Sequence, residues 1–225
     1  MNTVIVELLP MILGAALTPI EITIVLLMLA SRRGLAKAAA FVLGVTVVRL
    51  LQGVLFGIVF GASPDATAED GGMSPVTSTL LLVVGILLLI TCYREWVSAD
   101  DPDDPPPQWM QSIDQAAPLK ALGLGAGVVS INAKLWVFTL SAIGVIRAAG
   151  LGQTQGIIVY LIYAFLAQLL LILPILICAI APQASAVTLQ RATQLLEQYN
   201  RQIMIVATLV FGVYFSWKGL NGLLV

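Results

Sequence analysis

Three charged side chains interrupt the long apolar runs of this sequence, and they are the residues best suited to bind a polar ligand. Glu21 lies in the stretch LTPIEITIVLLML, Arg49 lies in the next apolar run, and Lys134 lies in the fourth. A charge at the centre of a bilayer costs about 3 kcal/mol on insertion-based scales. We therefore expect these charges to pair with one another or to face a water-filled cavity.

Uncharged polar residues accompany the charges. Together they form the predicted substrate-binding set: Thr18, Pro19, Glu21, Arg49, Gln52, Asn132, Lys134 and Gln168. Two positive charges against one negative charge leave a positive surplus, which favours an anionic headgroup and disfavours a metal cation. A second interpretation is that Glu21 only neutralises Lys134 or Arg49 and so locks the fold.

Pro19 predicts a break in the first apolar run, because proline removes a backbone hydrogen bond and bends a helix. The freed carbonyl and amide groups are tolerated in a membrane only where protein or water satisfies them, so broken helices often mark binding sites. On this interpretation the proline opens the helix and Glu21 uses the opening. A purely structural kink is the alternative.

The composition predicts an all-α integral membrane protein. Of 225 residues, 59% are hydrophobic and only 10% are charged, with a mean hydropathy of +0.99, whereas soluble domains carry about 25% charged residues. There is no histidine, and Cys92 and Cys178 fit no metal-binding spacing. We expect no metal, no cofactor and no enzymatic activity, since no nucleophile–base pair or cofactor motif is present. The net charge of −1, without a dense basic tract, argues against nucleic-acid binding.

Six apolar stretches are long enough to predict six transmembrane helices. They cover residues 4–30, 35–60, 76–97, 119–146, 156–181 and 203–224. The segment before the last stretch predicts a short amphipathic surface helix. The N-terminus lacks the positive region of a signal peptide, so we expect a retained first helix. Several glycines are expected to allow close helix packing: Gly14, Gly44, Gly85, Gly123, Gly127 and Gly212.

The distribution of basic residues predicts the orientation. The connectors after the first, third and fifth stretches hold most of them: Arg32, Arg33, Lys37, Arg94, Lys120, Arg191 and Arg201. Basic residues concentrate in cytoplasmic loops, so these connectors are predicted to be cytoplasmic and both termini to lie outside.

A weak internal repeat divides the chain into two halves. When GAALTPIE (from Gly14) is aligned with GVVSINAK (from Gly127), Pro19 meets Asn132 and Glu21 meets Lys134. We predict two three-helix repeats, 1–97 and 119–225, which are inverted because three crossings per repeat is an odd number. The acidic, proline-rich linker 98–118 joins them on the cytoplasmic side. It is expected to be a solvated tether, with a docking site for a protein partner as the alternative.

Four stretches of this sequence carry a family resemblance: ALTPIEITIVLLMLASRRG, AAAFVLG, WMQSID and LGLGAGVVSINAKLWVFTLSA. In this order they resemble the glycopeptidolipid-addressing protein family, which is grouped with the sulfolipid-addressing proteins in the lysine-exporter superfamily of six-span transporters. Thr18-Pro19 matches the family's Ser/Thr-Pro motif. Asn132-Ala133-Lys134 matches an Asn-Pro-Lys-like motif but lacks its proline, which puts a second helix break in doubt.

The resemblance implies a transporter that exports lipids or amphipathic metabolites across a bacterial inner membrane. We expect the cargo to be an anionic or zwitterionic lipid-like amphiphile of the glycolipid class. Two alternatives stay open: an exporter of amino acids or ions from the same superfamily, and a non-transporting scaffold for a lipid-export machine. Small-residue helix faces and the habit of the superfamily also favour a homodimer.

Overall fold

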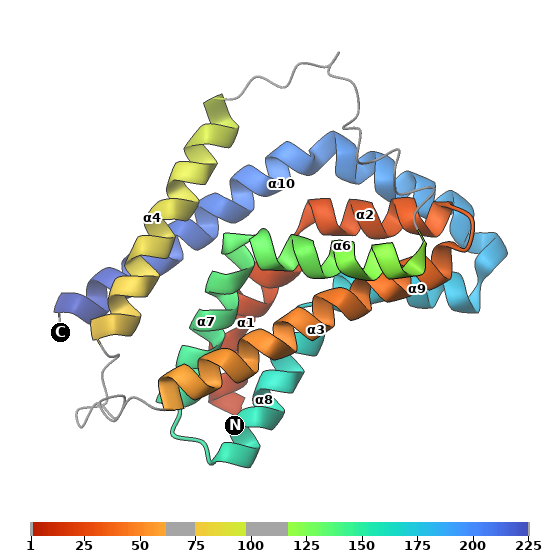
Figure 1. The fold of residues 1–225 in the computed structure, drawn as a ribbon. Coiled ribbons are helices and arrows are strands. Elements are labelled where there is room, and N and C mark those ends of the chain that lie inside the picture. The colour runs from red at the N-terminus through yellow and green to blue at the C-terminus, as the bar shows by residue number, and fades with distance from the viewer. Residues whose placement is uncertain (1, 62–74, 98–116, 225) are drawn as a thin grey trace.

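The computed structural model describes residues 2–61, 75–97 and 117–224, and its regular elements in these ranges are all α-helices (Figure 1). The helices are α1 (Asn2–Ala16), α2 (Pro19–Ala30), α3 (Gly34–Gly61), α4 (Pro75–Val97), α6 (Pro118–Ile131), α7 (Ala133–Ala148), α8 (Gln153–Leu166), α9 (Leu169–Ile180) and α10 (Pro182–Leu224). The predicted partner site in the acidic linker lies almost wholly outside the described residues.

The helices are those of a multi-pass membrane protein. Within the described ranges, Gly34–Ile58 and Arg201–Leu224 are each long and apolar enough to cross a bilayer. Three bent helix pairs raise the number of candidate spans to five if each pair counts as one. The predicted stretch 76–97 corresponds to α4, which is not among these five. The all-α membrane fold is therefore confirmed, whereas six spans in two inverted repeats stay a prediction.

The first apolar run is broken, as Pro19 predicts. α1 and α2 meet at an angle of 57°, and Pro19 occupies the first turn of α2. Proline suits this position because its ring fixes a helical φ and its missing N–H has no helical partner there. Thr18, directly before it, has the non-helical angles φ −122° and ψ 83°.

A second break lies at Asn132, although no proline is present. α6 and α7 meet there at 70°, so the doubt raised by the missing proline is removed. Asparagine is disfavoured in helix interiors because its side chain competes for backbone hydrogen bonds. The indole of Trp136 donates hydrogen bonds to the carbonyls of Val129 (3.1 Å) and Ser130 (3.0 Å), which satisfies acceptors left open at the end of α6.

A third break, at Ala167 and Gln168, was not predicted. α8 and α9 meet at 61°, and the nearest proline, Pro174, lies inside α9 rather than at the break. The side chain of Gln168 spans the gap, because its amide donates to the Ala164 carbonyl at 3.0 Å. Its carbonyl oxygen accepts a hydrogen bond of 2.8 Å from the Thr46 hydroxyl of α3.

The last part of the chain forms one helix, whereas the sequence predicts a short surface helix followed by a separate span. α10 runs without interruption over 43 residues, so the expectation of a separate surface helix before the last span is wrong. The physical reason is visible in the sequence, since no glycine or proline lies between Pro182 and Gly212. Figure 1 shows α10 lying along α4 over its C-terminal part.

Glycines bring the backbones of two helix pairs together. A Cβ at Gly125 of α6 would lie 2.1 Å from the Phe41 carbonyl oxygen of α3, and one at Gly85 of α4 would lie 2.3 Å from the Ser216 nitrogen of α10. The packing expectation is also confirmed at Gly14, Gly44 and Gly212. It is wrong at Gly123 and Gly127, where a Cβ would meet none of the described residues within 4 Å.

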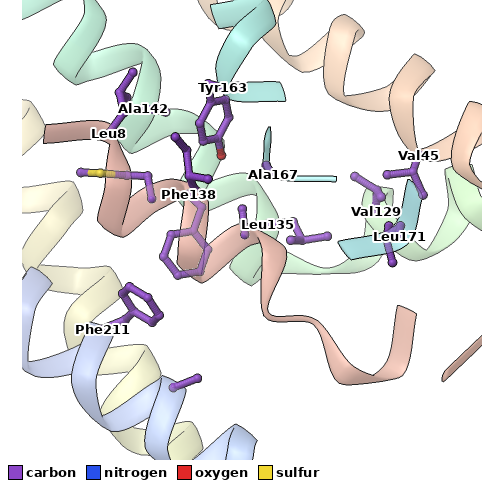
Figure 2. Close-up of a cluster of buried hydrophobic side chains, with 14 of the residues drawn as sticks. Leu8, Val45, Val129, Leu135, Phe138, Ala142, Tyr163, Ala167, Leu171 and Phe211 are labelled. Carbon is purple, nitrogen blue, oxygen red and sulfur yellow. The ribbon is translucent and has the colours of Figure 1, made fainter. Parts of the chain in front are cut away.

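The two predicted halves do not form separate bodies, because their helices pack through one another. α1 contacts α7, α3 lies along α6, and α10 contacts both α4 and α2. Figure 2 shows Phe138 of α7 pointing toward Phe211 of α10, with ring centroids 5.3 Å apart at 82°. The core therefore joins the N-terminal and C-terminal segments around the helix breaks.

Candidate substrate-binding site

Glu21 is buried at the start of α2, with only 1% of its surface exposed. The Thr18 hydroxyl donates a hydrogen bond to its Oε2 at 3.2 Å. Thr18 and Glu21 have the spacing of a capping box, but here the two side chains bond to each other instead of to the backbone. Oε1 has no hydrogen-bond partner among the described residues, so one carboxylate oxygen stays available.

Lys134 reaches from the first turn of α7 to the end of α1. Its ammonium donates a hydrogen bond of 3.1 Å to the Leu17 carbonyl. It also lies 5.8 Å from the centre of the Phe138 ring, within the range of a cation–π contact. Lys134, which lies just after the second helix break, thereby places a positive charge on a backbone carbonyl at the first break.

Arg49 lies in the middle of α3 with 1% of its surface exposed. Its Nη2 donates a long hydrogen bond of 3.4 Å to the Ala15 carbonyl. Within the part of the chain that the structure describes, its Nε and Nη1 have no acceptor. The Tyr160 hydroxyl donates to the backbone carbonyl of Arg49 at 2.5 Å, which ties α8 to this turn of α3. A buried guanidinium with two unused nitrogens is the strongest ligand-binding feature of the site.

Glu21 attracts both Arg49 and Lys134, but no ion pair joins it to either cation among the described residues. Both Arg49 and Lys134 act electrostatically on Glu21, with Arg49 the stronger. The hydrogen bonds of the two cations go instead to the backbone carbonyls of Ala15 and Leu17, at and just past the end of α1. Instead, the charges match the helix dipoles. The carboxylate lies at the positive start of α2, and the cations lie at the negative end of α1.

The polar residues of α3 are spaced three apart, and this spacing places them on one face of the helix. Thr46, Arg49 and Gln52 follow one another in this way. Gln52 has 2% of its surface exposed, and both polar atoms of its amide lack partners among the described residues. Thr46 was not predicted as a site residue, although its spacing from Arg49 could have identified it.

Two further buried hydroxyl groups were not predicted from the sequence. Tyr163 of α8 and Thr139 of α7 are almost fully buried. The Tyr163 hydroxyl lies beside that of Thr139 and within the field of Arg49, but neither hydroxyl has a well-formed hydrogen bond in the described residues. Figure 2 shows Tyr163 pointing from α8 into the core. Aromatic residues in apolar spans are common, so the sequence offered no specific signal.

The structure brings most of the predicted residues to the helix breaks. Thr18, Pro19, Glu21, Arg49 and Lys134 surround the break between α1 and α2. Gln168 forms the third break and bonds to α3 one turn before Arg49. The side chain of Asn132 does not cap α7, so this residue shapes the second break through its backbone. In the described ranges no three His, Cys, Asp or Glu residues gather where a metal could bind.

Comparison with known proteins gives one match. The family model described as Sap, sulfolipid-1-addressing protein, matches residues 8–221. This range includes all three helix breaks and every residue of the predicted site. The comparison with curated proteins and the comparison with solved structures returned no match.

Proposed function

The chain belongs to the sulfolipid-1-addressing protein family, and from this premise we propose that it is a transporter of an anionic or zwitterionic lipid-like amphiphile. The family name refers to a sulfolipid, a lipid whose headgroup is anionic. A buried site with a surplus of positive charge suits such a headgroup. The family match confirms the sulfolipid-addressing resemblance, while the link to the lysine-exporter superfamily stays a prediction.

The proposal rests mainly on the buried guanidinium of Arg49, two of whose nitrogens lack hydrogen-bond acceptors among the described residues. Leaving a buried donor without a partner costs about 1–3 kcal/mol, and more for a charged group. Among the described residues, Arg49 leaves two guanidinium nitrogens in this condition, and the amide of Gln52, three positions later on α3, also lacks partners. A phosphate, sulfate or carboxylate group would supply the missing acceptors. The binding of cargo would therefore remove a cost that the unliganded fold bears.

The helix breaks supply the rest of the proposed mechanism. Half-helices that end inside a membrane can tilt separately, so that a site between them opens first to one side and then to the other. We propose outward movement across a bacterial inner membrane, with both termini outside and the linker 98–118 in the cytoplasm. We also propose a homodimer and no enzymatic activity. The headgroup would contact the residues at the α1/α2 break while the acyl chains stay in lipid.

The test compares the thermal stabilisation of three purified proteins by lipids: the unchanged protein, Arg49→Lys and Arg49→Gln. An anionic glycolipid and a phospholipid are the probes, with a neutral diacylglycerol as the control lipid. Lysine keeps the charge but loses the planar fork of donors. We expect Arg49→Lys to fold normally and to lose about 1–3 kcal/mol of anionic-lipid binding, the share of a charged hydrogen bond.

Arg147→Lys is the matched control variant, because Arg147 is exposed at the end of α7. It should respond to each lipid as the unchanged protein does. Equal stabilisation of the unchanged protein and Arg49→Lys by the same anionic lipid would exclude a headgroup role for Arg49.

A deletion strain separates transport from a scaffold role. If the protein transports an amphiphile, that amphiphile should accumulate in the inner membrane fraction and decrease in the outer fraction. An unchanged lipid profile, accompanied by the loss of a co-purifying complex, would favour the scaffold instead.

A further inference from the structure

The ammonium of Lys134 lies against a backbone carbonyl at a helix break. In broken-helix transporters the unwound carbonyls at the C-terminal end of a half-helix coordinate Na⁺. Here the Leu17 carbonyl, just past the end of α1, accepts a hydrogen bond of 3.1 Å from Lys134. The neighbouring Ala15 carbonyl accepts from Arg49. The acceptors of the first break are thus filled by the chain's own cations.

The surroundings of the ammonium have the features of a cation site. The carboxylate of Glu21 attracts Lys134 electrostatically, and Oε1 of that carboxylate has no hydrogen-bond partner among the described residues. The face of the Phe138 ring lies 5.8 Å away. A carbonyl oxygen, a carboxylate and an aromatic face all favour positive charge, and the partial negative charge at the end of α1 adds to them.

We infer that the break between α1 and α2 is a monovalent-cation site that Lys134 fills with its own ammonium. A bound Na⁺ and this ammonium would compete for the same carbonyl oxygen, so the intact protein excludes Na⁺ from the site. Removal of the side chain beyond Cβ should leave a vacancy for a small cation or a short alkylammonium. The inference concerns Lys134 alone and holds whatever cargo the protein moves.

The experiment uses the purified full-length chain and measures its melting temperature with added cations at constant ionic strength. The variants are Lys134→Ala, which opens the site, and Lys134→Met, which fills the same space with an uncharged chain. The probes are Na⁺, n-propylammonium and tetramethylammonium. Propylammonium carries the same donor as lysine, whereas tetramethylammonium has no N–H to donate to Leu17.

We expect n-propylammonium to raise the melting temperature of Lys134→Ala by about 3 °C more than that of the unchanged protein. Na⁺ should give a smaller rise of the same sign. Tetramethylammonium should have no specific effect, and Lys134→Met should respond to none of the three cations. The double variant Lys134→Ala/Glu21→Gln should lose most of the response, because the attracting carboxylate is then neutral.

The inference is overturned if Lys134→Ala responds to all three cations as the unchanged protein does. If Lys134→Ala is too unstable to purify, the readout is the yield of monodisperse protein solubilised with n-propylammonium compared with tetramethylammonium. Equal yields in the two salts would also overturn it. Neither result depends on lipid binding by Arg49, so this inference and the proposed function can fail separately.

Discussion

Lys134 of α7 and Leu17 of the α1–α2 connection join two helix breaks by one hydrogen bond of 3.1 Å. The two residues lie 117 positions apart in the chain and belong to different predicted repeats. The bond places an ammonium on a carbonyl that the broken helix leaves without a helical donor. Stability of the first break therefore depends on a side chain of the second.

A double-mutant cycle tests how Glu21 and Lys134 interact. Breaking a direct buried ion pair costs about 3–5 kcal/mol, but here the two charges act at longer range and share Arg49. We expect a coupling free energy of about 1 kcal/mol between Glu21→Gln and Lys134→Met. The measurement is the melting temperature of the two single variants and the double variant. Strict additivity would show that the two residues are independent, while Glu21→Gln with the exposed Arg147→Met should be additive.

Two glycines of α6 provide a matched test of helix packing. Gly125→Ala should destabilise the fold by about 1–3 kcal/mol, because the new Cβ would lie 2.1 Å from the Phe41 carbonyl oxygen. Gly123 lies two residues earlier, on the opposite side of α6, where a new Cβ would meet none of the described residues within 4 Å. Gly123→Ala should therefore be neutral or stabilising by up to about 1 kcal/mol. Thermal unfolding of both variants checks the prediction. Equal melting temperatures would contradict the close approach of α3 and α6.

Pro19→Ala should keep the bend between α1 and α2. The second break at Asn132 shows that this fold bends a span without proline, and Lys134 and Arg49 still hold the α1 carbonyls. Spin labels at the exposed residues Val6 and Ala30 report the geometry by pulsed electron resonance. A straight helix would separate these positions by about 36 Å, and a shift to that distance in the variant would show that Pro19 alone imposes the break.

Thiol labelling of intact cells tests the predicted orientation. In a background without Cys92 and Cys178, reporter cysteines at Ser31 and Asp103 should be shielded from an impermeant reagent. A reporter at Gln153, at the exposed start of α8, should be labelled. Labelling of Asp103 with protection of Gln153 would invert the topology and with it the direction of export.

The sequence predicted the elements whose causes are local. Apolar runs located the membrane helices, and Pro19 located the first break because its ring has a fixed effect on the backbone. The positions of the charges also predicted which residues would gather at that break. The pattern Thr18 to Glu21 could further have indicated a helix start, since it has the spacing of a capping box.

Other features depend on contacts that a single sequence does not reveal. The break at Gln168 needs the Thr46 hydroxyl from another helix, and nothing near residue 168 marks its partner. The sequence left open whether Glu21 pairs with a cation or faces a cavity, and it could not show that the backbone carbonyls of Ala15 and Leu17 accept the hydrogen bonds of Arg49 and Lys134. These acceptors are available only once α1 has ended at Ala16.

The 43 residues of α10 follow a path about 65 Å long at 1.5 Å per residue, roughly twice the thickness of a bilayer's hydrocarbon core, and this path bends between its two ends (Figure 1). Its apolar part, Arg201–Leu224, is long enough to cross the membrane. If the segment between Pro182 and Arg201 moves as one rigid helix, a 10° tilt about Arg201 would carry its Pro182 end through about 5 Å. Because α10 also contacts α2, a movement of the half-helix that holds Glu21 would also displace α10.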